Sequence, residues 1–310
     1  MKKNYLTGSN NSLADILCCI NFNHSFYGNI EFLKKLYGGL FHIAFYGPDK
    51  ASGVNKIDSY HGYFAYVAVL DAIKRYPNYR GYIFVNDDCI INVWNFFKKN
   101  KNKIWIQPFH SLANRFDKQK KEWCWFNLSI GMSAYNAAFC SISAENRARL
   151  NTWFGSEDVV AAGPADFFYL PKNYSDDFIN LFEVFYQNKV FIEMSIPTGL
   201  RAIANKNNIE ILNCYNRVYY RLPGIKHNEE MGLRLNLFYS EKIDVYHPLK
   251  MSVLKNRMMI LRWFNMYFFK KHTVSSTFLR ILDKARPFVW FWIYLHITFK
   301  NFKLKKARKG

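Results

Sequence analysis

The chain has 310 residues, of which half are hydrophobic and 19% are aromatic, so it can bury a large core and wholesale disorder is excluded. Its net charge of +20 points to an anionic partner: nucleic acid, anionic lipid or a phosphorylated substrate. The charge is concentrated in residues 250–310, which carry fifteen Lys and Arg against one acid, whereas the first 249 residues are nearly balanced.

Strands and helices alternate along the first 90 residues. Short apolar runs at residues 15–22 and 40–46 are typical of buried strands, and the apolar spacing at residues 30–37 predicts a helix between them. A second helical pattern covers residues 60–75 and is followed directly by an apolar run at residues 81–85. This order predicts an α/β fold with a mostly parallel sheet, an architecture of the nucleotide-binding type.

The apolar run at residues 81–85 stops abruptly at Asn86, Asp87 and Asp88. Ligands of α/β sheets bind just past the carboxyl ends of the strands. Two adjacent carboxylates repel each other unless a positive charge lies beside them, and a divalent cation carrying a phosphate-bearing substrate would supply that charge. The alternative is a solvated turn whose two acids lie at the N-terminus of a helix starting near Cys89.

The rest of the body continues the α/β pattern without an internal repeat or a linker. Helices are predicted at residues 143–153 and 176–187, followed by a helix that begins near Pro197 and runs to about residue 207. The predicted strands are residues 104–107, 163–171, 190–194, 210–214 and 243–246.

The six cysteines include no Cys-x-x-Cys pair, so neither a zinc-binding pattern nor a disulfide framework is predicted, and buried, reduced thiols are expected. No apolar segment of signal-peptide length follows the N-terminal lysines, and no run reaches the roughly 18 apolar residues of a spanning helix. We therefore expect a soluble body.

Residues 250–310 differ from the body in composition. Two aromatic-rich segments, residues 253–269 and 288–299, are flanked by Lys and Arg, which suits helices lying on an anionic lipid surface. The alternatives are a core helix packed on the body and a nucleic-acid site, although contiguous aromatics fit base stacking poorly. We predict one domain over residues 1–249 and a basic, aromatic helical tail over residues 250–310, in a cytoplasmic protein held peripherally at the inner face of a membrane.

Four segments resemble GT-A fold glycosyltransferases, and the resemblance covers roughly residues 13–250. Asn86-Asp87-Asp88 resembles the Asp-x-Asp-type motif that holds a divalent metal and a nucleotide-sugar diphosphate, with Asn in place of the first acid. The loop after the first strand, residues 21–24, is similar to the segment that cradles the nucleotide. Residues 163–171 resemble a strand lining the acceptor side, and residues 244–250 look like a late segment whose histidine closes on the metal or diphosphate.

The resemblance implies a GT-A-like, Rossmann-type sheet flanked by helices and a metal-dependent glycosyltransferase. The enzyme would move a sugar from a nucleotide-sugar, most simply a UDP-sugar, to a glycan or lipid-linked acceptor, using Mn²⁺ or Mg²⁺ to stabilise the departing diphosphate. The implied metal ligands are Asp88 and His247, and the implied donor-binding residues are Asn21, Asn23, Asn86 and Asp87.

An inverting enzyme needs a carboxylate to deprotonate the acceptor hydroxyl. Glu193 is the first candidate because it is the one charge in an apolar segment, where an acid costs energy unless it has a partner. Asp166, which opens the segment at residues 163–171, is the second. The alternatives are an ion pair between Glu193 and Arg201 or another base, and a simple turn for Asp166.

Two other functions compete with a transferase. A non-catalytic, membrane-associated protein with a degenerate nucleotide-binding fold is favoured by Asn86 standing in place of an acid. A nucleic-acid binder acting through residues 250–310 is the other, whereas the transferase prediction expects no nucleic-acid partner.

Overall fold

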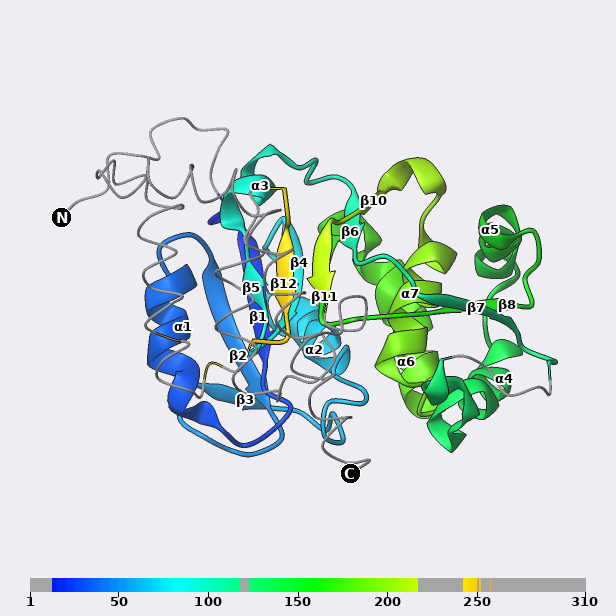
Figure 1. Ribbon diagram of the computed structural model, residues 1–310, viewed down its shortest axis with the longest axis horizontal. Coiled ribbons are helices and arrows are strands. Elements are labelled where there is room, and N and C mark those ends of the chain that lie inside the picture. The colour runs from blue at the N-terminus through cyan, green and yellow to red at the C-terminus, as the bar shows by residue number, and fades with distance from the viewer. Residues whose placement is uncertain (1–12, 118–122, 217–241, 250, 252–256, 258–310) are drawn as a thin grey trace, which may run out of the picture.

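The computed structural model describes residues 13–117, 123–216, 242–249, 251 and 257. Its centre is a mixed but mostly parallel sheet (Figure 1). Neighbouring strands follow the order β10 (Ile209–Ile211), β6 (Ile104–Ile106), β9 (Phe167–Pro171), β4 (Gly81–Asn86), β1 (Ile16–Asn21), β2 (His42–Gly47) and β3 (Val54–Lys56). Strand β9 runs antiparallel to β4 and β6, and the other pairs are parallel. The predicted α/β architecture is confirmed and is compatible with a Rossmann-like fold.

The central strands are buried on both faces because their alternating side chains enter two separate cores. In β4, Ile83 and Val85 face one core, and Tyr82 and Phe84 face the other. The helix α1 (Ile30–Tyr37) packs on the Ile83 side. The opposite face is covered by α2 (Val67–Arg75), α6 (Ser175–Gln187) and α7 (Ile192–Ile203).

Two small sheets complete the described fold. One joins β11 (Cys214–Asn216), β12 (Val245–His247) and β5 (Ile90–Ile91), and the other pairs β7 (Ser111–Asn114) with β8 (Val159–Ala162). The remaining helices are α3 (Val93–Lys98), α4 (Ala134–Phe139) and α5 (Ala144–Phe154). Short helical turns lie at Tyr27–Asn29, Cys124–Asn127, Ser129–Ser133, Lys172–Tyr174 and Lys206–Asn208.

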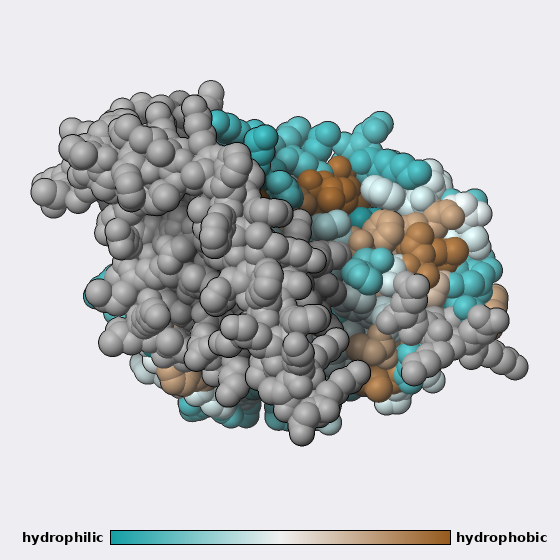
Figure 2. Space-filling view, viewed as in Figure 1, coloured by the Kyte–Doolittle hydropathy of each residue, from teal (hydrophilic) through white to brown (hydrophobic). Residues whose placement is uncertain are grey.

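Exposed apolar side chains are scattered over the surface. The face drawn in Figure 2 shows separate brown patches among teal residues over the half that contains β6, β7 and β10. Single exposed apolar residues are normal for globular proteins and need no special explanation. Among the residues that the structure describes, the large ones are Phe26, Tyr60, Leu112, Phe116, Leu128 and Ile211.

The helix predicted at residues 60–75 is wrong in its first turns. It begins only at Val67, and Tyr60, His61 and Gly62 all have positive φ, which a right-handed helix excludes. The predicted alternative for Asp87 and Asp88, the N-terminus of a helix at Cys89, is also wrong. Cys89 is followed by β5.

The sequence predicts that Glu193 lies in a strand, and this is wrong. Glu193 lies in the first turn of α7. Short apolar runs do not separate strands from buried helices, and here the helix starts before Pro197 and ends at Ile203. Pro197 has no N–H to donate to the carbonyl of Glu193. The N–H of Gly163 uses that carbonyl instead, at 2.9 Å, and so ties α7 to the segment before β9.

Some predictions fall wholly or partly outside the described residues. The tail, residues 250–310, lies outside them except for Met251 and Arg257, so its membrane helices and the proposed domain division stay predictions. In the part of the chain that the structure describes, no helix is long and apolar enough to cross a membrane. The six cysteines are all free, as predicted, although Cys124 and Cys140 are exposed rather than buried.

Candidate functional site

The ends of three strands bring polar side chains to one edge of the central sheet. Asn21 ends β1 and pairs in register with Asn86, which ends β4. Strand β9 runs the opposite way and pairs Phe167 with Val85, so Asp166, at its start, lies beside Asn86. The carboxyl ends of two parallel strands and the start of an antiparallel one therefore meet where ligands of such sheets bind.

Asn86 bridges its neighbours at this edge. Its Nδ2 donates to Oδ1 of Asp166 at 3.0 Å, and its Oδ1 accepts from Nδ2 of Asn21 at 3.2 Å. Asn21 Nδ2 also donates to Oδ1 of Asn23 at 2.7 Å. A carboxylate at position 86 could not donate to Asp166 and would repel it. Asn86, in the first motif position, therefore links Asn21 to Asp166, which an acid there could not do.

Asp87 and Asp88 form a turn that is fixed by backbone hydrogen bonds. The N–H of Asp87 donates to the carbonyl of Asn21 at 2.9 Å, and the carbonyl of Asp88 accepts from the N–H of Leu249 at 2.6 Å. Asn29 Nδ2 donates to Oδ2 of Asp87 at 3.3 Å. Burial, followed by the neighbouring charge of Asp88, raises the pKa of Asp87 to about 7, against the opposing hydrogen bond from Asn29.

His247 reaches the same place from the last described strand, β12. Asp244 anchors the start of that strand, since its carboxylate accepts from Asn95 Nδ2 and from the N–H of Asn213, both at 2.9 Å. The imidazole lies between two acids: Nε2 is 3.5 Å from Oδ1 of Asp88, and Nδ1 is 3.2 Å from Oδ2 of Asp166. Burial opposes its protonation, but the two carboxylates outweigh this and raise the pKa of His247 to about 9.

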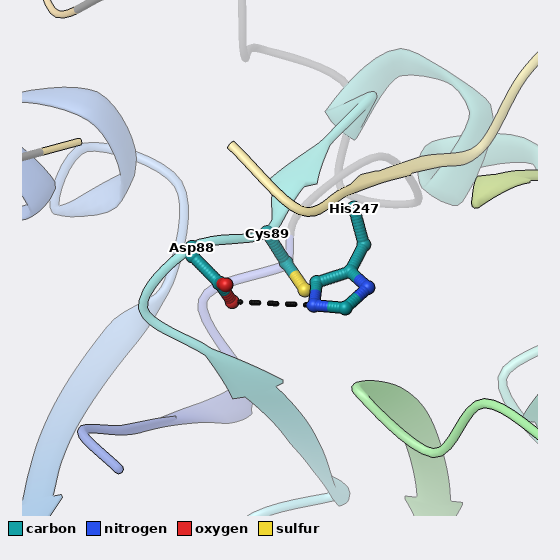
Figure 3. A group of neighbouring side chains, drawn as sticks. All are labelled: Asp88, Cys89 and His247. Carbon is teal, nitrogen blue, oxygen red and sulfur yellow. Dashed lines mark ion pairs between the residues drawn. The ribbon is translucent and has the colours of Figure 1, made fainter. Parts of the chain in front are cut away.

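Cys89 completes the inner side of this group. Its thiol is buried and donates to the carbonyl oxygen of Asp166, with Sγ 3.6 Å away. Figure 3 shows the sulfur beside the His247 ring and the Asp88 carboxylate aimed at the same ring. Burial, then the charge of Asp88, raises the pKa of the thiol well above its usual value.

Glu193 is close enough to Asp166 and His247 for their charges to act on it. Its Oε2 accepts from the indole Nε1–H of Trp123 at 3.1 Å. Burial and then the Asp166 charge raise the pKa of Glu193 to about 8, against the opposing effect of Trp123. The predicted alternative, an ion pair with Arg201, is wrong. Arg201 donates to the carbonyl of Pro197 at 2.6 Å, and in the described part of the chain it forms no ion pair with Glu193.

The group carries more acid than base, which bears on whether a metal fits. Four carboxyl groups lie around one imidazole. Burial is the main cause of the raised pKa values of Asp87, Asp166 and Glu193, and the charge of a neighbouring acid raises each of them further. Carboxylate oxygens and an imidazole nitrogen suit Mn²⁺ and, through the oxygens, Mg²⁺. The residues present therefore fit a divalent cation held by Asp88 and His247. The four acids are Asp87, Asp88, Asp166 and Glu193.

Four neighbours of the site carry no sequence signal. Asn29 and Trp123 contact the acids from elements far away in the chain, and nothing in their local sequence marks them. Arg257 donates to Oδ1 of Asn29 at 2.8 Å. Gly62, with positive φ, packs directly against the side chain of Asn23, and only a residue without a Cβ fits there.

Comparisons with known proteins point the same way. No protein-family model matches the chain. Over 187 residues it is 22% identical to a protein named probable glycosyltransferase STELLO1 and 19% identical to one named probable glycosyltransferase STELLO2, both from Arabidopsis thaliana. The match covers 57% of this chain but only 22% of each plant protein, so the chain spans a small part of these relatives. These distant similarities support a glycosyltransferase-like relationship.

Proposed function

We propose that the chain is a glycosyltransferase that uses a divalent cation to move a sugar from a nucleotide-sugar to an acceptor hydroxyl. One observation carries the proposal. Asp88 and His247 converge with three further acids at the carboxyl edge of a mostly parallel sheet, in a chain whose distant relatives are named glycosyltransferases. The GT-A fold is part of the proposal.

The donor half of the site is built around the turn after β4. Asp88 and His247 would hold Mn²⁺ or Mg²⁺, which when bound supplies positive charge next to a diphosphate. Asp87 keeps the turn in place through Asn29 and the backbone of Asn21. Asn21 and Asn23 follow β1 at the same edge and would contact the nucleotide.

Glu193 is the better candidate for the base. Its raised pKa lies near physiological pH, where proton transfer by a general base is most efficient. Asp166 accepts from Asn86 and faces His247, so we assign it the orientation of the ring. Glu193 would take the acceptor hydroxyl proton while that oxygen bonds to the anomeric carbon. The bond from this carbon to the diphosphate breaks, and its electron pair leaves with the diphosphate.

We take a UDP-sugar as the donor and a glycan or a lipid-linked molecule as the acceptor. The basic residues 250–310 support a lipid-linked acceptor, because each Lys or Arg near an anionic membrane adds about 1 kcal/mol of attraction. Attachment to the inner face of a membrane would concentrate the enzyme where such acceptors lie.

Release of nucleoside diphosphate from a panel of sugar nucleotides, with Mn²⁺ and a cell lipid extract, tests the proposal. We expect turnover that Asp88→Asn abolishes without loss of thermal stability. Glu183→Gln is the matched control, because Glu183 is an exposed acid of α6 that pairs with Lys74 of α2. Binding of UDP with Mn²⁺ but no turnover would favour the non-catalytic alternative, and RNA binding at physiological salt without liposome binding would favour the nucleic-acid one.

A further inference from the structure

A sulfur atom lies inside the proposed metal centre. The ligand atoms of Asp88, Cys89 and His247 all lie within 4.8 Å of one another. We propose that these three side chains form a centre for a thiophilic divalent cation of the zinc type, which competes with Mn²⁺ or Mg²⁺. That the competition affects donor binding rests on the proposed function, whereas zinc binding by the three residues does not.

The imidazole of His247 is already oriented as a metal ligand. A histidine that binds a metal through one ring nitrogen almost always donates its other N–H to a carboxylate, a carbonyl or water. Here Nδ1 faces Oδ2 of Asp166 at 3.2 Å, and the other oxygen of Asp166 is held by Asn86. When a cation displaces the proton on Nε2, this arrangement leaves the tautomer in which Nδ1–H faces Asp166 and Nε2 presents its lone pair on the side of Asp88 (Figure 3).

The three ligand types favour zinc over magnesium. Mg²⁺ takes oxygen ligands, whereas thiolate and imidazole suit Zn²⁺, which also exceeds Mn²⁺ in general affinity for such sites. One oxygen, one sulfur and one nitrogen are three protein ligands. Zinc with three protein ligands keeps a further position for substrate or water.

The centre has an open side and a closed one. The side chains of Asp88 and His247 are 32% and 19% exposed, so a cation can approach from their side, while buried Cys89 closes the inner side. Binding forms a zinc–sulfur and a zinc–nitrogen bond, breaks the S–H bond of Cys89 and the Nε2–H bond of His247, and releases both protons to solvent. The nearby acids then balance part of the charge of the cation.

Cadmium, which binds thiolates as zinc does, is the probe. The experiment uses the full chain with both Cys124→Ser and Cys140→Ser, a background that lacks the two exposed thiols. A chelator first removes any bound metal from it. Titration with Cd²⁺ alone should produce a sulfur-to-cadmium charge-transfer band in the ultraviolet that saturates at one equivalent. Cys89→Ser in the same background should abolish the band, and Cys214→Ser, which removes another buried thiol, should keep it.

Affinity measurements give the second readout. In competition with a chromophoric chelator, Cys89→Ser should weaken zinc binding at least about tenfold, the lower end for loss of a supporting residue around a metal. Binding of Mn²⁺, followed by the EPR signal of the free ion, should change less than about threefold because Mn²⁺ prefers the remaining oxygen and nitrogen ligands.

A cadmium band that survives Cys89→Ser, or zinc affinity that is unchanged in it, overturns the proposal. If Cys89→Ser fails to fold by circular dichroism, the ¹¹³Cd NMR shift of the unmutated background decides. A resonance in the sulfur-ligated range supports the centre, and one in the range of oxygen and nitrogen ligands alone overturns it. None of these measurements uses turnover, so failure of the zinc centre and failure of the transferase proposal are distinguishable.

Discussion

The imidazole Nδ1 of His247 lies 3.2 Å from Oδ2 of Asp166, although His247 ends β12 of a small sheet and Asp166 directly precedes β9 of the central sheet. The contact joins the last described strand, β12, to the start of β9. It also fixes which ring nitrogen faces Asp88. The late segment thus completes a site whose other parts lie at the ends of β1 and β4.

Asp166→Asn removes the charge beside the ring but keeps an oxygen that can accept from Nδ1. We expect the pKa of His247 to fall from about 9 toward or below its usual value, because burial already opposes protonation and Asp166 is the largest effect that raises the pKa. NMR titration of the imidazole of the metal-free protein measures this. An unchanged pKa would show that Asp166 does not act on the ring.

Much of the sheet and half of the site follow from local sequence. Apolar runs buried on both faces mark β1 and β4, and the abrupt stop at Asp87 and Asp88 marks the edge where ligands bind. The adjacency of Asp166 to Asn86 does not follow, because residue pattern does not encode the direction of a strand, and β9 is antiparallel.

Other parts of the site depend on tertiary contacts alone. The sequence predicts a strand for Glu193 because a run of four apolar residues around it fits a strand and a buried helix equally well. The hydrogen bond from Trp123 and the approach of Asn29 to Asp87 join distant segments and leave no local signal. Cys89 carries no metal-binding signal in the sequence because it is not part of a pair such as Cys-x-x-Cys.

Stability of the metal-free protein should fall as pH rises. Relative to their ordinary values of 3.8, 4.5 and 6.5, the pKa values of Asp87, Glu193 and His247 are raised to about 7, 8 and 9. Between each pair of values the folded chain binds a proton that the unfolded chain has released, so unfolding becomes easier with increasing pH. The stability is fully present at acid pH and is lost up to about pH 9.

Thermal unfolding in the presence of a chelator, from about pH 5 to 9, measures this loss. We expect Tm to fall by several degrees, because a loss of 1 kcal/mol lowers Tm by about 2–4 °C in domains of 150–250 residues. Saturating Mn²⁺ should reduce the fall because it supplies the missing positive charge. Glu193→Gln should flatten the lower part of the curve. A Tm that rises across this range would contradict the assigned pKa shifts.

Trp123 should set the pH at which Glu193 becomes a base. Its indole N–H donates to the carboxylate and opposes the effects of burial and Asp166. Trp123→Phe keeps an aromatic ring but removes the donor, so the pKa of Glu193 rises. Activity that needs the carboxylate then appears at higher pH, and the acid limb of the pH profile of kcat moves upward. Glu193→Gln should lower kcat about 10²–10⁴-fold. An unmoved limb would exclude Glu193 as the base.

Gly199 should be required by the packing of α7 on α6. A Cβ at this position would lie 2.8 Å from ring atoms of both Phe182 and Phe185. Ala gains about 1 kcal/mol over Gly in a helix, but overpacking a core typically costs about 1–3 kcal/mol, so Gly199→Ala should lower the free energy of unfolding by up to about 2 kcal/mol. Gly39→Ala, where a Cβ meets nothing within 4 Å, is the control. Equal denaturant midpoints for the two variants would contradict this.

Arg257 should act on the site through Asn29. Its Nη2 donates to Oδ1 of Asn29 at 2.8 Å, its Nε donates to the carbonyl of Met251 at 2.5 Å, and the Asn29 amide thereby directs Nδ2 at Asp87. Because the two side chains serve one contact, Arg257→Ala and Asn29→Ala should weaken binding of UDP with Mn²⁺ to similar extents. The double variant should be no weaker than either, a coupling of about 0.5–3 kcal/mol in a calorimetric double-mutant cycle. Arg257→Lys keeps the charge but loses the planar fork, so it should restore only part of the affinity. Additive losses would show that Arg257 does not act through Asn29.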